Sequence, residues 1–188
     1  MAISTIDQTG LNAPLTLTSP VLTTPNLGTP SAVNLSNATA LPKSAMPSGT
    51  VIQTVAFGNN TQYSGTSGAE TYLFSASITP TYSNSKILIN YSVASGVSSN
   101  SPNFAIQLLL RRGTTTAGTL IAYQRFGRYE AATVTREMFA CNSLCGLDSP
   151  ATTSSVSYGV FVSNVDGNCT YSINNNGNTS MILQEIVG

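Results

Sequence analysis

The sequence predicts an all-β fold: a jelly-roll-like β-sandwich preceded by an extended, proline-rich N-terminal strap. Three observations lead to this prediction. Residues 50–188 contain short apolar or alternating segments separated by turn residues. Six of the nine prolines (at 14, 20, 25, 30, 42 and 47) lie in residues 1–50, which excludes helices and central strands there. Charged residues make up only 7% of the 188 residues, so the usual surface residues of helices are nearly absent.

The strap, residues 1–48, carries a local five-residue repeat. TLTSP, VLTTP and NLGTP follow one another from residue 16 to residue 30. This period fits neither the helix, with about 3.6 residues per turn, nor the strand, and it indicates an extended, partly polyproline-like chain. A disordered linker is the alternative. Ordering such a chain costs about 1–2 kcal/mol per residue, more than a few leucines return, so we expect its own domain, symmetry mates or a larger partner to hold it.

Residues 50–188 are predicted to form eight or nine strands, enough for a two-sheet sandwich with a real core. The clearest alternation runs from Ile87 to Val93, where Ile, Ile, Tyr and Val share one face. Around Tyr158–Val162 apolar residues occupy both faces, so we expect that strand to be covered on both sides. The expected strands are residues 50–57, 71–79, 86–94, 104–111, 120–126, 133–142, 155–163, 169–173 and 181–187.

The composition argues against several functions. Seven basic and seven acidic residues give zero net charge, so no excess positive charge exists to neutralise phosphates, and we expect no nucleic-acid binding. The absence of histidine removes Ser-His-Asp and Cys-His mechanisms. No apolar run reaches about 18 residues, so we expect no membrane insertion. The start, MAISTIDQTG, lacks the regions of a secretory signal, so we expect synthesis and assembly in a cytoplasm.

The three cysteines, Cys141, Cys145 and Cys169, are expected to be buried free thiols, because cysteine is among the most buried residue types. An odd number cannot form a closed intrachain disulfide framework. A metal site at Cys141 and Cys145 would need two more soft ligands, and the sequence offers only Cys169. We therefore expect no metal site and no cofactor.

Two pairs of acidic residues could meet across a sugar: Glu130 with Glu137, and Asp148 with Asp166. A glycosidase needs two carboxylates about 5–9.5 Å apart. Nothing in the sequence spacing requires that arrangement. We therefore expect no enzymatic activity, with a carbohydrate-active enzyme as an alternative, and we expect the acids to form ion pairs or contacts between subunits.

Five of the seven basic residues lie between positions 111 and 136, interleaved with aromatic residues and acids. Sugar or nucleic-acid binding would use such a pattern. Arginine is also favoured at protein interfaces, where its planar fork pairs with carboxylates or carbonyls, and we favour this interpretation. The candidate contacts between subunits are Arg111, Arg125, Arg128, Tyr129, Glu130, Arg136 and Glu137.

The segment LTLTSPVLTTPNLGTPSAVNLSNATALP (15–42) resembles strap segments in virion appendage and fibre proteins of tailed phages, especially marine ones. SASITPTYSNSKILINYSV (75–93) and SMILQEIVG (180–188) resemble the β-rich head domain of the same proteins. The resemblance implies that the N-terminal part attaches to the particle and that the β domain forms a homotrimer and projects. The strap residues assigned to anchoring are Leu17, Pro20, Leu22, Pro25, Leu27, Pro30, Val33, Leu35 and Leu41.

We therefore expect a non-enzymatic structural protein of a virion, assembled in the host cytoplasm. The favoured version is a capsid decoration, cement or short head-fibre protein that contacts the major capsid protein or tail and adaptor proteins. The alternative is a short tail fibre or tail-tip adhesin that recognises a host surface glycan. Its candidate recognition loops are Ser98–Asn103 and Asn174–Asn178.

Overall fold

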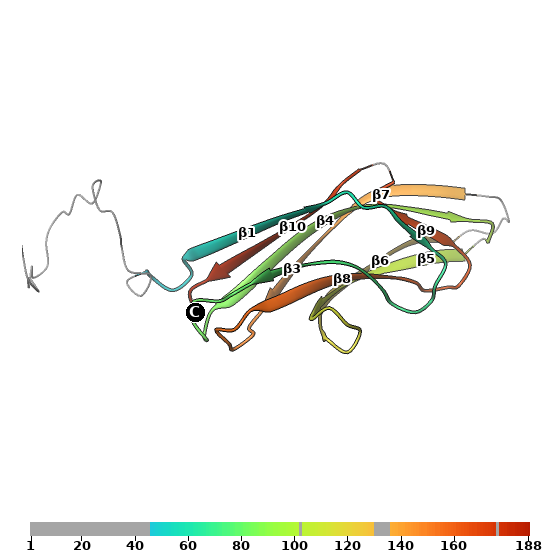
Figure 1. Ribbon diagram of the computed structural model, residues 1–188. Helices are drawn as coiled ribbons and strands as arrows, with labels where there is room; N and C mark the ends of the chain where they lie inside the picture. Colours follow the sequence, from blue (N-terminus) through green and yellow to red (C-terminus); the bar gives the residue numbers. More distant parts are fainter. Residues whose placement is uncertain (1–45, 102, 130–135, 176) are drawn as a thin grey trace, which may run out of the picture. The chain divides into compact units, whose positions relative to one another are not determined.

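The computed structural model describes residues 46–101, 103–129, 136–175 and 177–188, and within these ranges every regular element is a β-strand (Figure 1). Most of the predicted strap, residues 1–45 with its anchoring residues, lies outside the described residues. The strands are β1 (Val51–Asn59), β2 (Tyr63–Gly65), β3 (Thr71–Ile78), β4 (Lys86–Ser99), β5 (Asn103–Arg112), β6 (Thr119–Tyr129), β7 (Arg136–Asp148), β8 (Val156–Asn164), β9 (Thr170–Ile173) and β10 (Thr179–Ile186).

The strands form two antiparallel sheets whose order is that of a jelly roll. In one sheet β10 and β9 follow each other along the same side of β4, and β7 covers the other side of β4. Beyond them, β1 pairs with β10 and β2 pairs with β9. The second sheet has the order β3-β8-β5-β6. If β1–β2 and β9–β10 are each counted as one interrupted strand, two four-stranded sheets result, and the predicted jelly-roll-like sandwich is confirmed.

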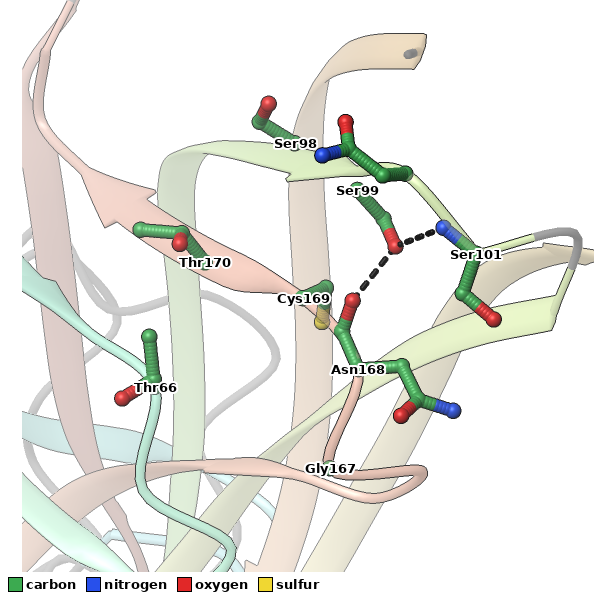
Figure 2. A pocket seen from close by; sticks show the side chains of 9 residues that line it. Thr66, Ser98, Ser99, Ser101, Gly167, Asn168, Cys169 and Thr170 are labelled. Atoms are coloured by element: carbon green, nitrogen blue, oxygen red, sulfur yellow. Dashed lines mark hydrogen bonds between the residues drawn. The ribbon is translucent and has the colours of Figure 1, made fainter. Parts of the chain in front are cut away.

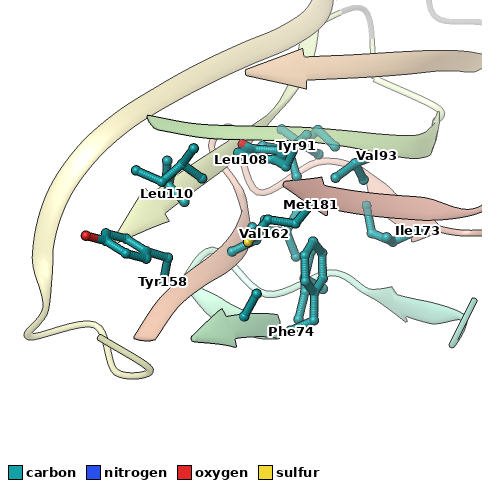
Figure 3. Close-up of a cluster of buried hydrophobic side chains, with 14 of the residues drawn as sticks. Phe74, Tyr91, Val93, Leu108, Leu110, Tyr158, Val162, Ile173 and Met181 are labelled. Atoms are coloured by element: carbon teal, nitrogen blue, oxygen red, sulfur yellow. The ribbon is translucent and has the colours of Figure 1, made fainter. Parts of the chain in front are cut away.

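The core lies between the two sheets, where inward-facing side chains of both interdigitate (Figure 3). The predicted alternation on β4 is confirmed, because Ile87, Ile89, Tyr91 and Val93 are all buried. Strand β8 is buried on both faces, as its apolar content predicts. The largest fully buried side chains are Leu73, Ile87, Ile89, Phe104, Ile106, Leu108, Leu110, Tyr158, Phe161, Ile173, Met181 and Leu183.

The interruption between β9 and β10 is held by Asn174, a buried residue with a positive φ of 59°. Its backbone N–H donates to the carbonyl oxygen of Ala94 at 2.8 Å. Its side-chain amide donates to the carbonyl oxygens of Asn59 (3.2 Å) and Thr61 (2.9 Å), and its Oδ1 accepts from the Thr179 hydroxyl at 2.6 Å. Asparagine tolerates the left-handed backbone and supplies both donor and acceptor. Its side chain therefore joins the β1–β2 interruption to the start of β10, and its backbone N–H joins it to β4.

The structure differs from the predicted strands by one added strand and by the bounds of several others. The three-residue strand β2 was not predicted, because Tyr63–Gly65 is too short for a recognisable alternation. Strand β4 continues to Ser99, beyond the predicted end at residue 94, through small residues that were assigned in part to a turn. Strand β7 continues to Asp148, beyond its predicted end at residue 142, and its predicted start at residue 133 lies outside the described residues.

Candidate functional site

The basic residues predicted to contact other subunits fall into two separate groups. Arg111, on β5, forms a paired contact with Glu70: its Nε and Nη2 donate to the two carboxylate oxygens at 2.8 and 2.7 Å. Its Nη1 donates to the Gly118 carbonyl oxygen at 2.8 Å. The hydrogen bond to Glu70 raises the pKa of Arg111 above its usual value. Arg111 is therefore engaged within its own chain, with a partner that sequence reasoning did not assign.

The second group lies on β6, an edge strand of the four-stranded sheet. Arg125, Arg128 and Tyr129 are exposed, and 69% of Tyr129 is accessible to solvent. An oxygen of Asp166 lies 4.0 Å from Nη2 of Arg125. Edge position, exposure and positive charge make this strand end suitable for contact with another chain.

The remaining predicted contact residues are two residues at the start of β7 and Glu130, which follows β6 in the sequence. Glu137 is exposed on β7, opposite Ser98 of β4. Arg136 is the first residue of β7 and lies opposite Ser99. Glu130 lies outside the described residues, so its pairing with Glu137 is not described.

The second carboxylate pair is held apart by the fold. Asp148, at the end of β7, accepts a hydrogen bond of 2.8 Å from the Tyr158 hydroxyl and lies 3.5 Å from Nε of Arg112. Burial, together with this hydrogen bond, raises the pKa of Tyr158. Asp166 follows the opposite end of β8, about 20 Å along the strand at ~3.3 Å per residue. Asp148 and Asp166 therefore do not form the pair that a glycosidase requires.

A buried carboxylate that the sequence did not single out connects β10 to the loop before β4. Glu185 is fully buried. Its Oε1 accepts from the backbone N–H of Thr81 at 2.6 Å, from that of Tyr82 at 3.3 Å and from the Ser85 hydroxyl at 2.8 Å. Its Oε2 accepts from the Thr81 hydroxyl at 3.0 Å. With donors on both oxygens, Glu185 has a structural role: it fixes the β3–β4 loop.

The expectation of three buried thiols was wrong for two of them. Cys141 and Cys145 are exposed, and only Cys169 is buried. The reason is the register of β7: its even-numbered residues face the core, whereas 141 and 145 face outward. Burial raises the pKa of the Cys169 thiol from 9.0 to about 11. Within the described residues no group of three or more Cys, Asp or Glu side chains is placed to hold a metal ion.

Cys141 and Cys145 belong to a broad surface that sequence reasoning missed. We call it the open sheet face: the outward-facing residues of β1, β10, β4 and β7. Across these described strands its charged residues are Lys86 and Glu137, at opposite ends. Its members are Val51, Thr54, Ala56, Gly58, Ser180, Ile182, Gln184, Ile186, Lys86, Leu88, Asn90, Ser92, Ala94, Gly96, Ser98, Glu137, Phe139, Cys141, Ser143, Cys145 and Leu147.

Large apolar side chains project from the open sheet face into solvent. Phe139 and Leu147 are 57% and 56% exposed, and Val51 and Ile182 are 45% and 41% exposed. Phe139 stands opposite Gly96 of β4, and Ser92 and Ala94 of the same strand are also small, so the face is hollowed along β4 rather than flat. Such a charge-poor surface with exposed apolar side chains is typical of a region that another chain covers.

Two hollows lie along β4 and β7 on the open sheet face. The first, of about 310 Å³, is centred on the pair Ser92–Ser143 and extends to Cys145 and Ile182. The second, of about 240 Å³, is centred on the pair Gly96–Phe139 and includes residues 94, 95, 140, 141 and 175. A side chain at Gly96 would collide with Phe139, because an added Cβ would lie 2.8 Å from its ring. The small outward residues of β4 therefore create the hollows.

A separate polar pocket of about 640 Å³ lies where the end of β4 meets the start of β9 (Figure 2). Its lining carries hydroxyl and amide groups and no charge. The backbone N–H of Ser101 donates to the Ser99 hydroxyl, which in turn donates to the carbonyl oxygen of Asn168. Residues 98–101 come from the first predicted recognition loop. Asn175, from the second loop, borders the Gly96–Phe139 hollow instead, so the two loops do not share one site.

The described residues contain no helix long and apolar enough to cross a membrane. No protein-family model matches the sequence, and no curated protein matches it. Among solved structures, the VP2 subviral particle of infectious bursal disease virus is similar at 12% identity and a TM-score of 0.30. That match covers 73% of this chain, which spans only 39% of the VP2 chain.

The CBM22-1 xylan-binding domain from Paenibacillus barcinonensis Xyn10C is similar at 10% identity and a TM-score of 0.33, over 77% of this chain and 99% of that domain. A match to the Gt strain of infectious bursal disease virus has 14% identity and a TM-score of 0.28, over 89% of this chain and 45% of that chain. Values this low describe a distant likeness between β-rich chains and carry no information about activity.

Proposed function

We propose that this chain is a non-enzymatic structural protein of a tailed-phage virion, a homotrimer that its N-terminal strap anchors to the particle. In this proposal it serves as a capsid decoration, cement or short head-fibre protein. The observation that carries the proposal is the open sheet face, a surface of four strands whose charges lie only at its two ends. The jelly roll, a fold of many viral capsid domains and also of lectins, is compatible with this role.

The physical argument starts from solubility. A chain with zero net charge has little electrostatic repulsion to keep its copies apart, so it tends to associate. The open sheet face adds exposed apolar area, and covering that area removes it from water at about 25 cal/mol per Å². A protein that functions as a free monomer gains nothing from such a surface, whereas an assembly protein does.

In this proposal two different surfaces make the contacts between subunits and the contacts with the particle. The exposed end of β6, with Arg125, Arg128 and Tyr129, contacts neighbouring subunits of the trimer. The open sheet face is covered when the protein is anchored in the particle. A threefold arrangement presents three straps at once, so individually weak contacts add through a high effective concentration.

The decisive experiment deletes residues 1–45 and uses sedimentation to measure how the shortened chain binds to particles that lack this protein. We expect the shortened chain to keep its β-sheet circular dichroism and its trimer mass in light scattering, and to lose particle binding. A shortened chain that still decorates particles would refute the anchoring role of the strap.

Two substitutions test the surfaces separately. Phe139→Lys places a charge on the open sheet face and should weaken particle binding. Tyr72→Lys, at an aromatic side chain of the opposite sheet that is 42% exposed against 57% for Phe139, is its control and should bind normally. Tyr129→Ser should lower the trimer mass at low protein concentration while leaving the monomer folded, since its side chain makes no part of the core.

A second candidate function, recognition of a host surface glycan, is favoured by the polar pocket. Its hydroxyl and amide lining offers neutral hydrogen-bonding groups, which suit an uncharged sugar. A glycan array probed with the full chain tests it, with Asn168→Ala as the pocket variant. Binding that the variant loses would support an adhesin, and an array without signal would exclude it for the glycans displayed.

A further inference from the structure

The two hollows on the open sheet face follow each other along strand β4. Their centres lie near residues 92 and 96 of β4, four residues apart. At ~3.3 Å per residue in a strand this is about 13 Å. The next position in the same direction is the apolar pair Leu88–Leu147. The face thus offers three apolar or hollow positions in one row.

The N-terminal strap carries apolar side chains at nearly the same spacing. Leu17, Leu22 and Leu27 recur every five residues, with a proline three residues after each. In a polyproline-like chain, which rises ~3.1 Å per residue, successive leucines lie about 15 Å apart. Two hollows and one apolar position can therefore receive three leucines with a mismatch of about 2–3 Å per step.

The distribution of charge and the connection of the strap to β1 also support docking of the strap on the open sheet face. Residues 15–30 contain no charged residue, and the central part of the open sheet face contains none either. The strap is continuous with β1, which is itself an edge strand of this sheet. Residues 31–45 can span about 50 Å when extended, which exceeds the face's length of about 40 Å. The segment can therefore reach the equivalent face of an adjacent molecule.

We propose that the open sheet face is the docking site for residues 15–30 of a neighbouring copy, with Leu17, Leu22 and Leu27 placed along its two hollows and the Leu88–Leu147 pair. This inference rests on the proposed function, because a strap docked on its own domain would anchor nothing. It names the surface to which the strap binds: the jelly roll of the next copy. Strap exchange then links the copies into a continuous layer.

The exposed cysteines of β7 report on this docking directly. Cys141 borders one hollow and Cys145 the other, so a strap lying in the row covers both thiols. We expect the assembled wild-type chain to react with a maleimide at these two residues at least about tenfold more slowly than a chain with Leu17, Leu22 and Leu27 changed to Ser. Peptide mass spectrometry separates these thiols from buried Cys169.

A matched control changes Thr18, Thr23 and Thr29 to Ala and should keep the thiols protected. Equal, fast reaction of wild type and leucine variant would overturn the inference. Equal, slow reaction would also overturn it, because the face would then be covered by something other than the leucine repeat. Circular dichroism checks that each strap variant is folded, so that loss of protection is separated from unfolding.

A mixing experiment identifies the donor molecule. The acceptor chain carries the Leu→Ser changes and both thiols, and the donor chain carries the native leucines with Cys141→Ser and Cys145→Ser. After co-expression, slow reaction of the acceptor thiols supports docking between copies. If those thiols stay fast while wild type is protected, the strap docks on its own molecule and the proposed exchange is wrong.

Failure of this inference and failure of the proposed function give different results. Exchange-dependent protection in a protein that does not bind particles would overturn the virion role and leave the docking site in place. Particle binding by a protein whose thiols react at full rate would overturn the docking site and leave the virion role.

Discussion

Replacing Glu185 by alanine is expected to destabilise the domain strongly, although the residue lies far along the chain from the loop it fixes. The carboxylate is fully buried and accepts four hydrogen bonds from Thr81, Tyr82 and Ser85. The Glu185→Ala variant removes all four and leaves the buried Ser85 hydroxyl without its partner. Hydrogen bonds to a charged group contribute about 1.5–3 kcal/mol each, and an orphaned buried donor costs about 1–3 kcal/mol.

These contributions do not add fully, because Thr81 is exposed and its donors can bind water instead. We expect a loss of about 2–4 kcal/mol in the free energy of unfolding, out of about 7–20 kcal/mol for a domain of this size. The corresponding fall in Tm is about 10 °C. Urea unfolding followed by circular dichroism measures the first quantity, and a thermal scan measures the second.

Glu185→Gln is the matched control. Its carbonyl oxygen can replace Oε1, which accepts three of the four hydrogen bonds, and its volume is nearly the same. We expect a loss of only about 1 kcal/mol, because neutral hydrogen bonds replace charge-assisted ones. If the alanine and glutamine variants unfold at the same urea concentration as wild type, the carboxylate does not fix the loop and this reasoning is wrong.

Three further predictions concern single contacts. Tyr158→Phe removes the 2.8 Å hydrogen bond to buried Asp148 and should lower the free energy of unfolding by about 1–3 kcal/mol; an unchanged urea midpoint would contradict the contact. Burial raises the pKa of Cys169 from 9.0 to about 11, so above pH 9 the unfolded chain loses this proton before the folded chain does. Stability should therefore fall between pH 9 and about pH 11, and Cys169→Ala should make this fall shallower in urea titrations at each pH. In Gly127→Ala the added Cβ would collide with the Phe104 carbonyl oxygen and lie 2.6 Å from the Ala105 Cα, so we expect a loss of about 1–3 kcal/mol. Gly58→Ala, in open space on β1, should change the unfolding midpoint little, and equal effects of the two alanines would contradict the close approach of β5 and β6.

The sequence predicted where the strands lie better than it predicted which of their side chains are buried. Alternation identified β4 because every second residue from Ile87 to Val93 is a large apolar or aromatic one, with Asn90 and Ser92 between them. It also identified β8 as doubly covered. Alternation alone does not say which face of β7 points to the core, since Cys141 and Cys145 are small and moderately apolar like residues on either face. Their exposure follows from the pairing with β4, which only the structure shows.

The open sheet face was hidden for a related reason. Its members come from four strands that are up to about 130 positions apart in the sequence, and each contributes only one or two large side chains. No local window of the sequence contains enough of them to form a pattern. The same holds for Glu185, whose partners lie about a hundred residues earlier. Ion pairs were expected, but their choice of partner, such as Glu70 for Arg111, depends on tertiary contacts.

The place where the N-terminal segment enters the jelly roll has a mechanical consequence. Gly49 N–H donates to the Val187 carbonyl at 2.8 Å and Val187 N–H donates to the Thr50 carbonyl at 3.0 Å, so the entry point is clamped to the last strand. A force applied along β1 loads these bonds and all the β1–β10 backbone hydrogen bonds at the same time, in shear. A sideways pull peels the pairs one after another and needs far less force. The domain can thus bear tension along one axis and release under tension across it.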